Sequence, residues 1–299
     1  MDMNGASSYS HLVDRAFIFI LGTSVLLLIG LTGVMIYFLV RYRRSKNPNP
    51  AQIKDNVTLE TLWTVLPTIL VLVMFYYGWA GFKVMRDIPE DAMPVTVKAQ
   101  MWSWVFEYEN GKQSTELIVP TGRSVSLNLE SSDVIHSFFV PAFRLKEDCM
   151  PGRTNHAWFK SIRDGDYNIF CAEYCGERHS AMLSMVRSIP AKEFDEWLGV
   201  DTGPPEGTQL LAIKGCVACH SIDGSKLIGP SFKGMFGRTE TVVTDGVPRQ
   251  IVVDEQYIRK SIFEPNADIV EGYQPLMPAQ GDLLTEEEIE AIIEVIKDL

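Results

Sequence analysis

The chain has 299 residues, of which 46% are hydrophobic and 22% charged, and its formal net charge is −11. This length favours about two domains, and the acidic balance argues against nucleic acid as a partner. The high hydrophobic share in a chain with this many charges indicates apolar segments concentrated in one region.

Two uncharged runs near the N-terminus, residues 17–40 and 61–82, are each longer than the ~20 residues that cross a ~30 Å hydrocarbon core. The basic stretch 41–46 between them argues against two buried helices of a soluble protein. The first run also exceeds the apolar part of a signal peptide, and no small-residue cleavage site follows it. We therefore expect a membrane-embedded hairpin over residues 15–90, with transmembrane helices over 15–40 and 59–83.

The basic residues between the runs fix the orientation, because positively charged short loops stay in the cytoplasm. We expect both termini, including an N-terminal segment 1–14, on the external, periplasmic side of a bacterial plasma membrane. Everything after Lys83 then lies outside as well, and it carries most of the acidic residues. This charge suits the solubility of an exposed domain and also favours basic protein partners.

Between residues 93 and 190 the apolar positions recur with period two, as in the stretch 95–99. Turn signals such as Asn110-Gly111 bound these short runs, which are rich in β-branched and aromatic residues. The pattern predicts an antiparallel sandwich or barrel over residues 91–198. A Gly- and Pro-rich stretch over 199–206 then predicts a linker.

After the linker, Cys216-Val217-Ala218-Cys219-His220 has the C-x-x-C-H pattern of covalent haem c attachment. The thiols form thioethers to the haem, and the adjacent His220 takes one axial position on the iron. A zinc or redox C-x-x-C is the alternative, and both the adjacent His and the external location argue against it. Met277, in a Pro-punctuated loop before a terminal helix over 286–299, is the expected sixth ligand. Met235 is the competing candidate and lies closer to the attachment site.

The stretch 171–182 offers Cys171, Cys175, His179 and Met182, all soft or borderline metal ligands. Thiolate and imidazole with a thioether favour copper and argue against structural zinc. Two such cysteine sulfurs can each bridge two coppers, which then need one further terminal ligand each. A mononuclear blue copper site with one Cys, two His and an axial Met is the nearest alternative, but it leaves the second thiol unused.

His179 supplies one terminal ligand, and the other must come from elsewhere among the five histidines. His220 belongs to the haem motif, and His11 precedes the first membrane helix. His136 lies at an apolar strand end, where an unpaired imidazole would be costly. His156 is expected to cap a strand at the surface, which leaves His136 as the candidate ligand.

With these motifs the chain resembles subunit II of the haem–copper cytochrome c oxidases, in the form that carries a fused C-terminal cytochrome c domain. The resemblance covers nearly the whole chain and implies a multidomain membrane protein. It combines a two-helix transmembrane hairpin with an all-β cupredoxin-like Greek-key sandwich over 91–198 and an all-α class I cytochrome c domain over 207–299. Electrons would pass from a donor to haem c, then to a binuclear copper centre (CuA), then to subunit I. Oxygen reduction and proton pumping belong to that partner, so this chain holds no oxygen site.

The resemblance also implies the copper ligands. Cys171 and Cys175 would be bridging thiolates, and His136 and His179 would be terminal imidazole ligands. Met182 would be a weak axial thioether ligand, and Glu173 would give its backbone carbonyl. The Glu173 side chain would point toward a magnesium ion at the junction with subunit I. Cys149 usually has a small apolar counterpart in this family, and we expect it to be a buried small hydrophobe and not a ligand.

Two further segments resemble the family. In residues 58–64, Glu60 would lie near the mouth of a proton pathway, and an ordinary interfacial carboxylate is the alternative. Met101-Trp102-Ser103-Trp104 resembles the aromatic segment through which electrons enter, with Trp102 retained and Ser103 where an aromatic residue is usual. Two buried core tryptophans are the alternative for this segment.

Two other functions stay open. One is the electron-accepting subunit of a CuA-type nitric oxide reductase, and the other is a membrane-tethered redox carrier or copper/haem sensor without a catalytic partner. The hairpin favours a membrane partner, because a tether alone needs a single helix. The intact copper ligand set argues against a quinol donor. The expected partners are therefore subunit I and further oxidase subunits, a cytochrome or other respiratory donor, and membrane lipid.

Overall fold

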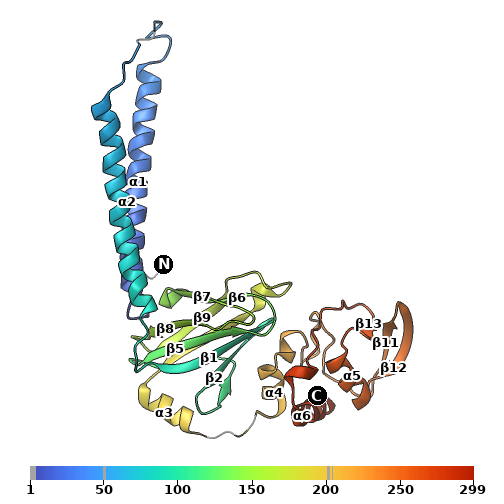
Figure 1. Cartoon of the computed structure of the whole chain (residues 1–299). Coiled ribbons are helices and arrows are strands. Elements are labelled where there is room, and N and C mark those ends of the chain that lie inside the picture. The colour runs from blue at the N-terminus through green and yellow to red at the C-terminus, as the bar shows by residue number, and fades with distance from the viewer. Residues whose placement is uncertain (1–4, 50–51, 201–202, 204) are drawn as a thin grey trace.

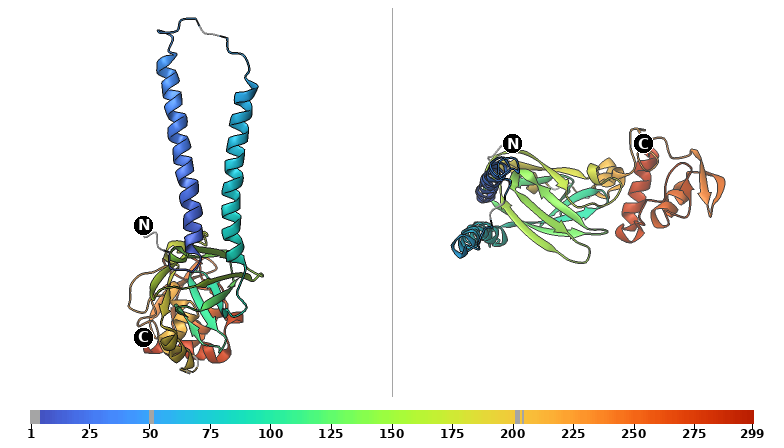
Figure 2. Two further views of the ribbon diagram at one scale, coloured as in Figure 1. Left: turned by 90° about the vertical axis from the view of Figure 1, so that its left-hand side faces the viewer. Right: turned by 90° about the horizontal axis from the view of Figure 1, so that it is seen from above.

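The computed structural model describes residues 5–49, 52–200, 203 and 205–299. A long helical hairpin is followed by a β-sandwich and then by a smaller C-terminal domain (Figure 1). The hairpin projects from one end of the sandwich, and the C-terminal domain lies beside the other end (Figure 2). Within the predicted linker 199–206, residues 201, 202 and 204 lie outside the described residues.

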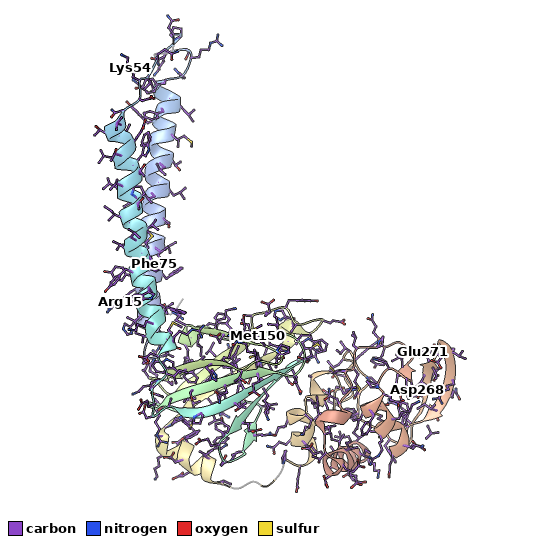
Figure 3. The ribbon with its side chains drawn as sticks, in the orientation of Figure 1. Arg15, Lys54, Phe75, Met150, Asp268 and Glu271 are labelled. Atoms are coloured by element: carbon purple, nitrogen blue, oxygen red, sulfur yellow. The ribbon has the colours of Figure 1, made fainter. Side chains whose placement is uncertain are left out.

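The two long apolar helices are confirmed as α1, Ser10–Arg41, and α2, Val57–Arg86, and both are long and apolar enough to cross a membrane. Figure 3 places Arg15 near the sandwich end of α1 and Lys54 in the loop at the far end of the hairpin. The first helix begins at Ser10, earlier than expected, so the predicted N-terminal segment 1–14 is partly helical. Residues 1–4 of that segment lie outside the described residues.

The early start of α1 has a tertiary cause, because the residues before it pack on the sandwich. Tyr9 is buried and donates its hydroxyl to the Trp158 carbonyl at 2.8 Å, and the Ala6 amide donates to the Ala142 carbonyl at 2.7 Å. Helix α2 is fastened separately, since Arg86 forms an ion pair with Glu147 at 2.7 Å. Both helices are thus attached to the sandwich, at the ends that lie beside it, by separate contacts.

The sandwich consists of two five-stranded sheets. The first has the order β3-β2-β1-β5-β8: Gln113–Ser114, Ser103–Tyr108, Met93–Gln100, Ser124–Ser131 and Asn155–Lys160. The second has the order β4-β10-β9-β6-β7: Leu117–Pro120, Leu183–Ile189, Gly165–Cys171, His136–Val140 and Leu145–Cys149. Helix α3, Ala191–Gly199, ends this part of the chain.

The sheets are not purely antiparallel, so that part of the prediction is wrong. Strand β1 pairs with β5 in parallel, and β4 pairs with β10 in parallel. A parallel pair needs a crossover connection, and here the chain passes through the other sheet between the paired strands. The period-two burial is confirmed, because Val95, Val97 and Ala99 are all buried. These inward positions form one core between the sheets, which extends to the candidate site described below.

The C-terminal domain has helices α4, Gly207–Ile213, α5, Glu255–Phe263, and α6, Glu286–Asp298. Thr285 and Glu288 form a capping box at the start of α6. The apolar stripe expected on this helix is buried in the domain's own core: Ile289, Ile292, Ile293 and Ile296.

This domain is not all-α, which corrects the expectation from the resemblance. A three-stranded sheet has the order β12-β11-β13, with bounds Val247–Val252, Thr239–Thr244 and Ile269–Val270. Strands β11 and β12 form a hairpin whose turn residues, Asp245 and Gly246, have φ of 49° and 81°. Positive φ at both central positions is typical of a type I′ turn, for which Asp-Gly is a preferred sequence.

Candidate metal centre

Two neighbouring strands of the second sheet bring the predicted copper ligands together. His136 begins β6 and Cys171 ends β9, and these strands are antiparallel, with Phe138 opposite Cys171. The loop after β9 carries Cys175 and a short 3-10 helix, His179–Ala181, before Met182 leads into β10. Residues distant in sequence therefore meet at one edge of the sandwich core.

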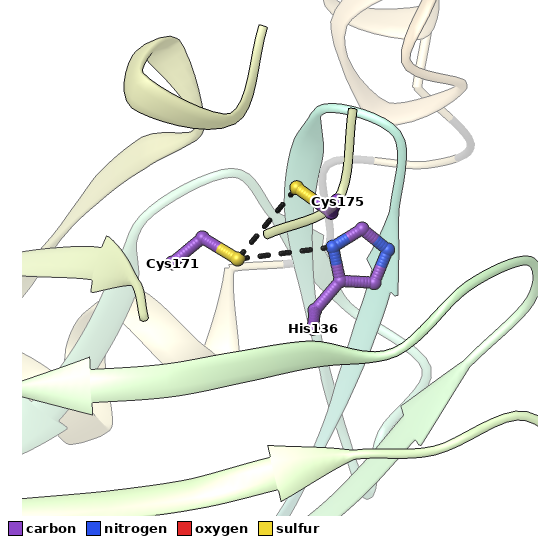
Figure 4. Close-up of side chains that lie close together, drawn as sticks. All are labelled: His136, Cys171 and Cys175. Carbon is purple, nitrogen blue, oxygen red and sulfur yellow. Dashed lines mark hydrogen bonds between the residues drawn. The ribbon is translucent and has the colours of Figure 1, made fainter. Parts of the chain in front are cut away.

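The donor atoms of these side chains form one cluster. The Cys171 and Cys175 sulfurs are 3.7 Å apart, and the Cys171 sulfur lies 3.9 Å from His136 Nδ1 (Figure 4). On the other side, the Cys175 sulfur lies 3.5 Å from His179 Nδ1 and 3.9 Å from Met182 Sδ. The two sulfurs are too far apart for a disulfide, whose bond is about 2.05 Å long.

The chemistry of this donor set fits copper. His136 and Met182 are 0% exposed, and both cysteines are buried free thiols. Thiolate, imidazole and thioether ligands held together suit copper. The Glu173 carbonyl accepts a hydrogen bond from the Cys171 thiol at 3.1 Å, while the Glu173 side chain is exposed.

Asp133, which no sequence motif singles out, orients His136. The Nε2–H of His136 donates to Asp133 Oδ1 at 2.8 Å, which leaves Nδ1 facing the Cys171 sulfur. The other Asp133 oxygen accepts the Met101 amide at 2.6 Å. Burial alone would lower the pKa of His136, but the bond to Asp133 outweighs burial and raises this pKa to about 8.

The two thiols ionise unequally. Burial disfavours the Cys171 thiolate, but hydrogen bonds from His136 and from the backbone outweigh burial and lower its pKa to about 6. Burial and the charge on Cys171 raise the pKa of Cys175 to about 12. A second thiolate in this cluster therefore needs a further positive charge beside it, which a bound metal ion supplies.

The two tryptophans of the 101–104 segment have different environments. Trp102 donates its indole N–H to the Cys175 carbonyl at 3.0 Å, so it touches the cluster. A Cβ at Gly176, whose φ is 113°, would lie 3.1 Å from the Trp102 ring, so glycine permits this close approach. Trp104 is a core residue that packs edge-to-face against Phe138 at 5.6 Å.

Two other residues lie where the sequence predicted. Cys149 is fully buried opposite His136 in the β6–β7 pair, and burial raises its pKa to about 12, as expected of a thiol that acts as a small hydrophobe. His156 is exposed on β8, with Nδ1 3.0 Å from Asn128 Oδ1.

The C-x-x-C-H motif begins in a short 3-10 helix, Cys216–Ala218. His220 Nδ1–H donates to the Pro230 carbonyl at 2.7 Å, which leaves Nε2 free to coordinate a metal. The imidazole stacks on Phe232 at 4.6 Å, and a Cβ at Gly229 would lie 2.7 Å from its Cε1 atom. Burial lowers the pKa of His220, so the imidazole is held in the neutral form that ligates metals.

This motif opens onto a mainly apolar cavity in the C-terminal domain. Cys216, Cys219 and His220 line it, and so do both candidate sixth ligands, Met277 and Met235. The opposite walls come from α5 and α6: Ile258, Ile262, Ile292 and Ile296. Two free thiols, a neutral imidazole and a thioether around an apolar cavity fit a covalently attached haem.

Glu60 is not brought near either cluster. It lies in the first turn of α2, at the end of the hairpin remote from the sandwich (Figure 1). Its backbone carbonyl accepts the Thr64 hydroxyl at 2.8 Å, and its side chain is exposed.

Comparison with known proteins agrees with this architecture. The model of the cytochrome c oxidase subunit II transmembrane domain matches residues 3–79, and that of the periplasmic domain matches residues 106–189. Cytochrome c oxidase subunit 2 of Bacillus sp. (strain PS3) is 30% identical over 291 residues, covering 87% of this chain and 79% of that protein. The chain belongs to the cytochrome c oxidase subunit II family.

A second curated relative and a solved structure are also similar to this chain. Cytochrome c oxidase subunit 2 of Alkalihalophilus pseudofirmus is 29% identical over 302 residues, covering 94% of this chain and 85% of that protein. The periplasmic domain of subunit II of cytochrome oxidase from Bradyrhizobium japonicum is 30% identical and covers 38% of this chain and 94% of that chain, with a TM-score of 0.36.

Membership of this family implies association with subunit I in a haem–copper terminal oxidase. The periplasmic domain of the family implies CuA copper, and the helical hairpin matches its membrane domain. The alignment with the Alkalihalophilus protein spans 94% of the chain, so the similarity extends beyond the sandwich into the C-terminal domain.

Proposed function

We propose that this subunit II takes electrons from a respiratory donor at a haem c in its C-terminal domain and passes them through a binuclear CuA centre to subunit I. Subunit I then reduces oxygen to water and pumps protons. The observation that carries the proposal is the donor cluster of the sandwich. Its two thiols lie 3.7 Å apart, with the His136 imidazole beside Cys171 and the His179 imidazole beside Cys175.

In this centre the thiolates of Cys171 and Cys175 would hold both coppers between them, and His136 and His179 would each hold one of the two ions. Met182, through its thioether, and Glu173, through its backbone carbonyl, would complete the ligand set. When bound, the copper pair supplies a one-electron couple shared over two thiolates. Asp133 fixes the His136 ring for this role through the bond to Nε2. The exposed Glu173 carboxylate would be available to a magnesium ion at the junction with subunit I.

In the C-terminal domain Cys216 and Cys219 would attach haem c, and His220 would ligate its iron. The bond from His220 to the Pro230 carbonyl supports this role, because it fixes the ring with Nε2 free. We assign Met277 as the sixth ligand ahead of Met235, and both line the cavity. Haem c, when bound, supplies the couple that accepts electrons from the donor, and methionine ligation raises its potential.

The remaining assignments concern the membrane part and the partners. Both termini and both redox domains lie on the periplasmic side of the membrane. Trp102 is the residue through which electrons reach the copper centre. Glu60 lies at the mouth of a proton pathway in the assembled oxidase. The acidic surface suits a basic donor protein. The relatives named above are cytochrome c oxidases, which favours this function over a nitric oxide reductase or a tethered sensor.

The test uses the purified oxidase complex. Beyond the haem and copper that subunit I itself holds, metal analysis should give two coppers and one haem iron per copy of this chain. The Cys175→Ser protein should keep its haem c spectrum but lose near-infrared copper absorption and oxidase turnover. Cys149→Ala is the matched control, because this buried thiol lies outside the donor cluster. Unchanged turnover in Cys175→Ser would contradict the copper assignment.

A further inference from the structure

The two redox domains touch at the turn between β1 and β2, residues 100–103, which we call the docking turn. Gln100 and Met101 of this turn line the haem-motif cavity together with Gly215, Cys216 and Cys219. Cys219 also packs against the core of the sandwich. The C-terminal domain therefore contacts the sandwich through the attachment motif itself, on the side where α4 lies (Figure 1).

Gly215 makes the closest of these contacts. A Cβ at this position would lie 2.3 Å from Gln100 Nε2 and 3.0 Å from Ser103 Oγ. Gln100 Nε2 donates to Ser103 Oγ at 3.3 Å, so both neighbours of Gly215 belong to one hydrogen-bonded pair. Even one added methyl group would have to break that pair or move the attachment motif away from the turn.

The same docking turn is bonded to the copper cluster. Between Gln100 and Ser103 lie Met101, whose amide donates to Asp133, and Trp102, whose indole donates to the Cys175 carbonyl. Asp133 in turn accepts His136 Nε2–H. The docking turn thus contacts the haem motif on one side. On the other side it bonds to Asp133, which orients His136, and to the backbone of Cys175.

We infer that Gly215 is a positioning residue. Because it has no side chain, the haem attachment motif can pack directly on the docking turn, and this contact sets the distance between the two redox centres. This inference rests on the proposed function. Filling the contact should leave each centre intact and slow the electron transfer between them.

The test substitutes Gly215→Ala and Gly215→Leu in the purified oxidase. Haem c and copper spectra should persist, and the rate of copper reduction after flash reduction of haem c should fall, more in the Leu variant than in the Ala variant, because the longer side chain displaces more of the contact. The enhancement of copper electron-spin relaxation by ferric haem, which depends on their separation, should weaken in the same order.

Gly237→Ala and Gly237→Leu are the matched controls. Gly237 has φ of 76° against 77° for Gly215, lies in the same domain, and a Cβ added to it would meet nothing within 4 Å. These variants carry the same backbone strain without the contact, so their transfer rate and relaxation should match the unsubstituted protein. Adding Gln100→Ala to Gly215→Ala removes the nearest neighbour and should restore much of the rate.

Wild-type transfer and relaxation in both Gly215 variants would overturn the inference, and so would an equal loss in the Gly237 variants. If the Gly215 variants fail to bind haem, Ser103→Leu fills the same contact from the sandwich side and should slow transfer likewise. A missing haem c or copper spectrum in the unsubstituted protein would instead contradict the proposed function itself.

Discussion

The indole N–H of Trp102 and the backbone carbonyl of Cys175 form a 3.0 Å hydrogen bond that joins the β1–β2 turn to the metal-binding loop. Trp102 is only 7% exposed, so the bond is shielded from water. Removing the donor leaves a buried carbonyl unsatisfied, which costs about 1–3 kcal/mol.

Trp102→Phe should therefore destabilise the sandwich by about 1–3 kcal/mol and slow reduction of the copper centre. Trp104→Phe is the control, because its buried indole N–H has no partner among the described residues and only packing is lost. Thermal unfolding and stopped-flow reduction measure the two effects. Equal slowing in both variants would contradict a specific role for Trp102.

Asp133→Ala should lower copper affinity about 10–100-fold, because His136 loses the group that orients its ring. Asp133→Asn, which keeps one acceptor oxygen, should fall between this variant and the unsubstituted protein. Competition with a copper chelator measures the affinity. Asp148→Ala is the control, since Asp148 bonds to Ser137 and Lys146 and not to His136. Unaltered affinity in Asp133→Ala would refute the orienting role.

Gly229→Ala should displace His220, because the new Cβ would lie 2.7 Å from the imidazole. The expected result is lower haem incorporation and an altered Soret spectrum in whatever haem is bound. Gly199→Ala has open space around its Cβ position and should behave as the unsubstituted protein. Normal incorporation with a normal spectrum in Gly229→Ala would show that His220 does not need this position.

The carboxylate of Asp268 is buried in the C-terminal domain (Figure 3), where it accepts bonds from Lys260 Nζ at 2.7 Å and from Arg249 Nη2 at 2.8 Å. Burial opposes its ionisation, but these bonds and one from Thr244 outweigh burial and lower its pKa. Asp268→Asn should cost about 1–3 kcal/mol of stability near neutral pH.

The pH dependence of that loss follows from the lowered pKa. A carboxylate whose pKa is lower in the folded state contributes its full stabilisation above the unfolded pKa of about 4. This stabilisation is lost progressively as the pH falls from there through the lower folded-state pKa. The difference between Asp268→Asn and the unsubstituted protein should therefore shrink below pH ~4. Thermal unfolding at a series of pH values measures it, with Asp245→Asn in the exposed hairpin turn as control. A constant difference down to low pH would exclude the ionised carboxylate as the cause.

Local patterns in the sequence predicted most of the fold. The apolar runs, the alternation at 95–99 and the stripe on α6 each report how a short segment is buried, and all three are confirmed. The parallel pairings of β1 with β5 and of β4 with β10 escaped prediction, because pairing partners depend on how the chain crosses between sheets. The β11–β12 hairpin did have a local signal, Asp245-Gly246 between β-branched residues, which the resemblance to an all-α domain outweighed.

The candidate site shows the same division. The loop spacing and the shortage of histidines selected the residues that the structure brings together around Cys171 and Cys175. The roles of Asp133 and Gly215 could not be predicted, because each depends on a contact with a residue of another segment. An aspartate three residues before a histidine, or a glycine directly before a cysteine, is common in sequences. Its role becomes visible only when the fold shows which residue it contacts.

The attachment of residues 5–10 to the sandwich constrains the order of assembly. Tyr9 is made early in synthesis, yet its partner Trp158 follows 149 positions later. The N-terminal segment can dock only after the sandwich has folded. The first helix must therefore be inserted into the membrane before the sandwich residues that bind its N-terminal end have been made. Closing so long a loop is slow compared with forming local structure. The attachment of residues 5–10 is therefore a late step of biogenesis, and it joins the first helix to the external domain only once that domain is complete.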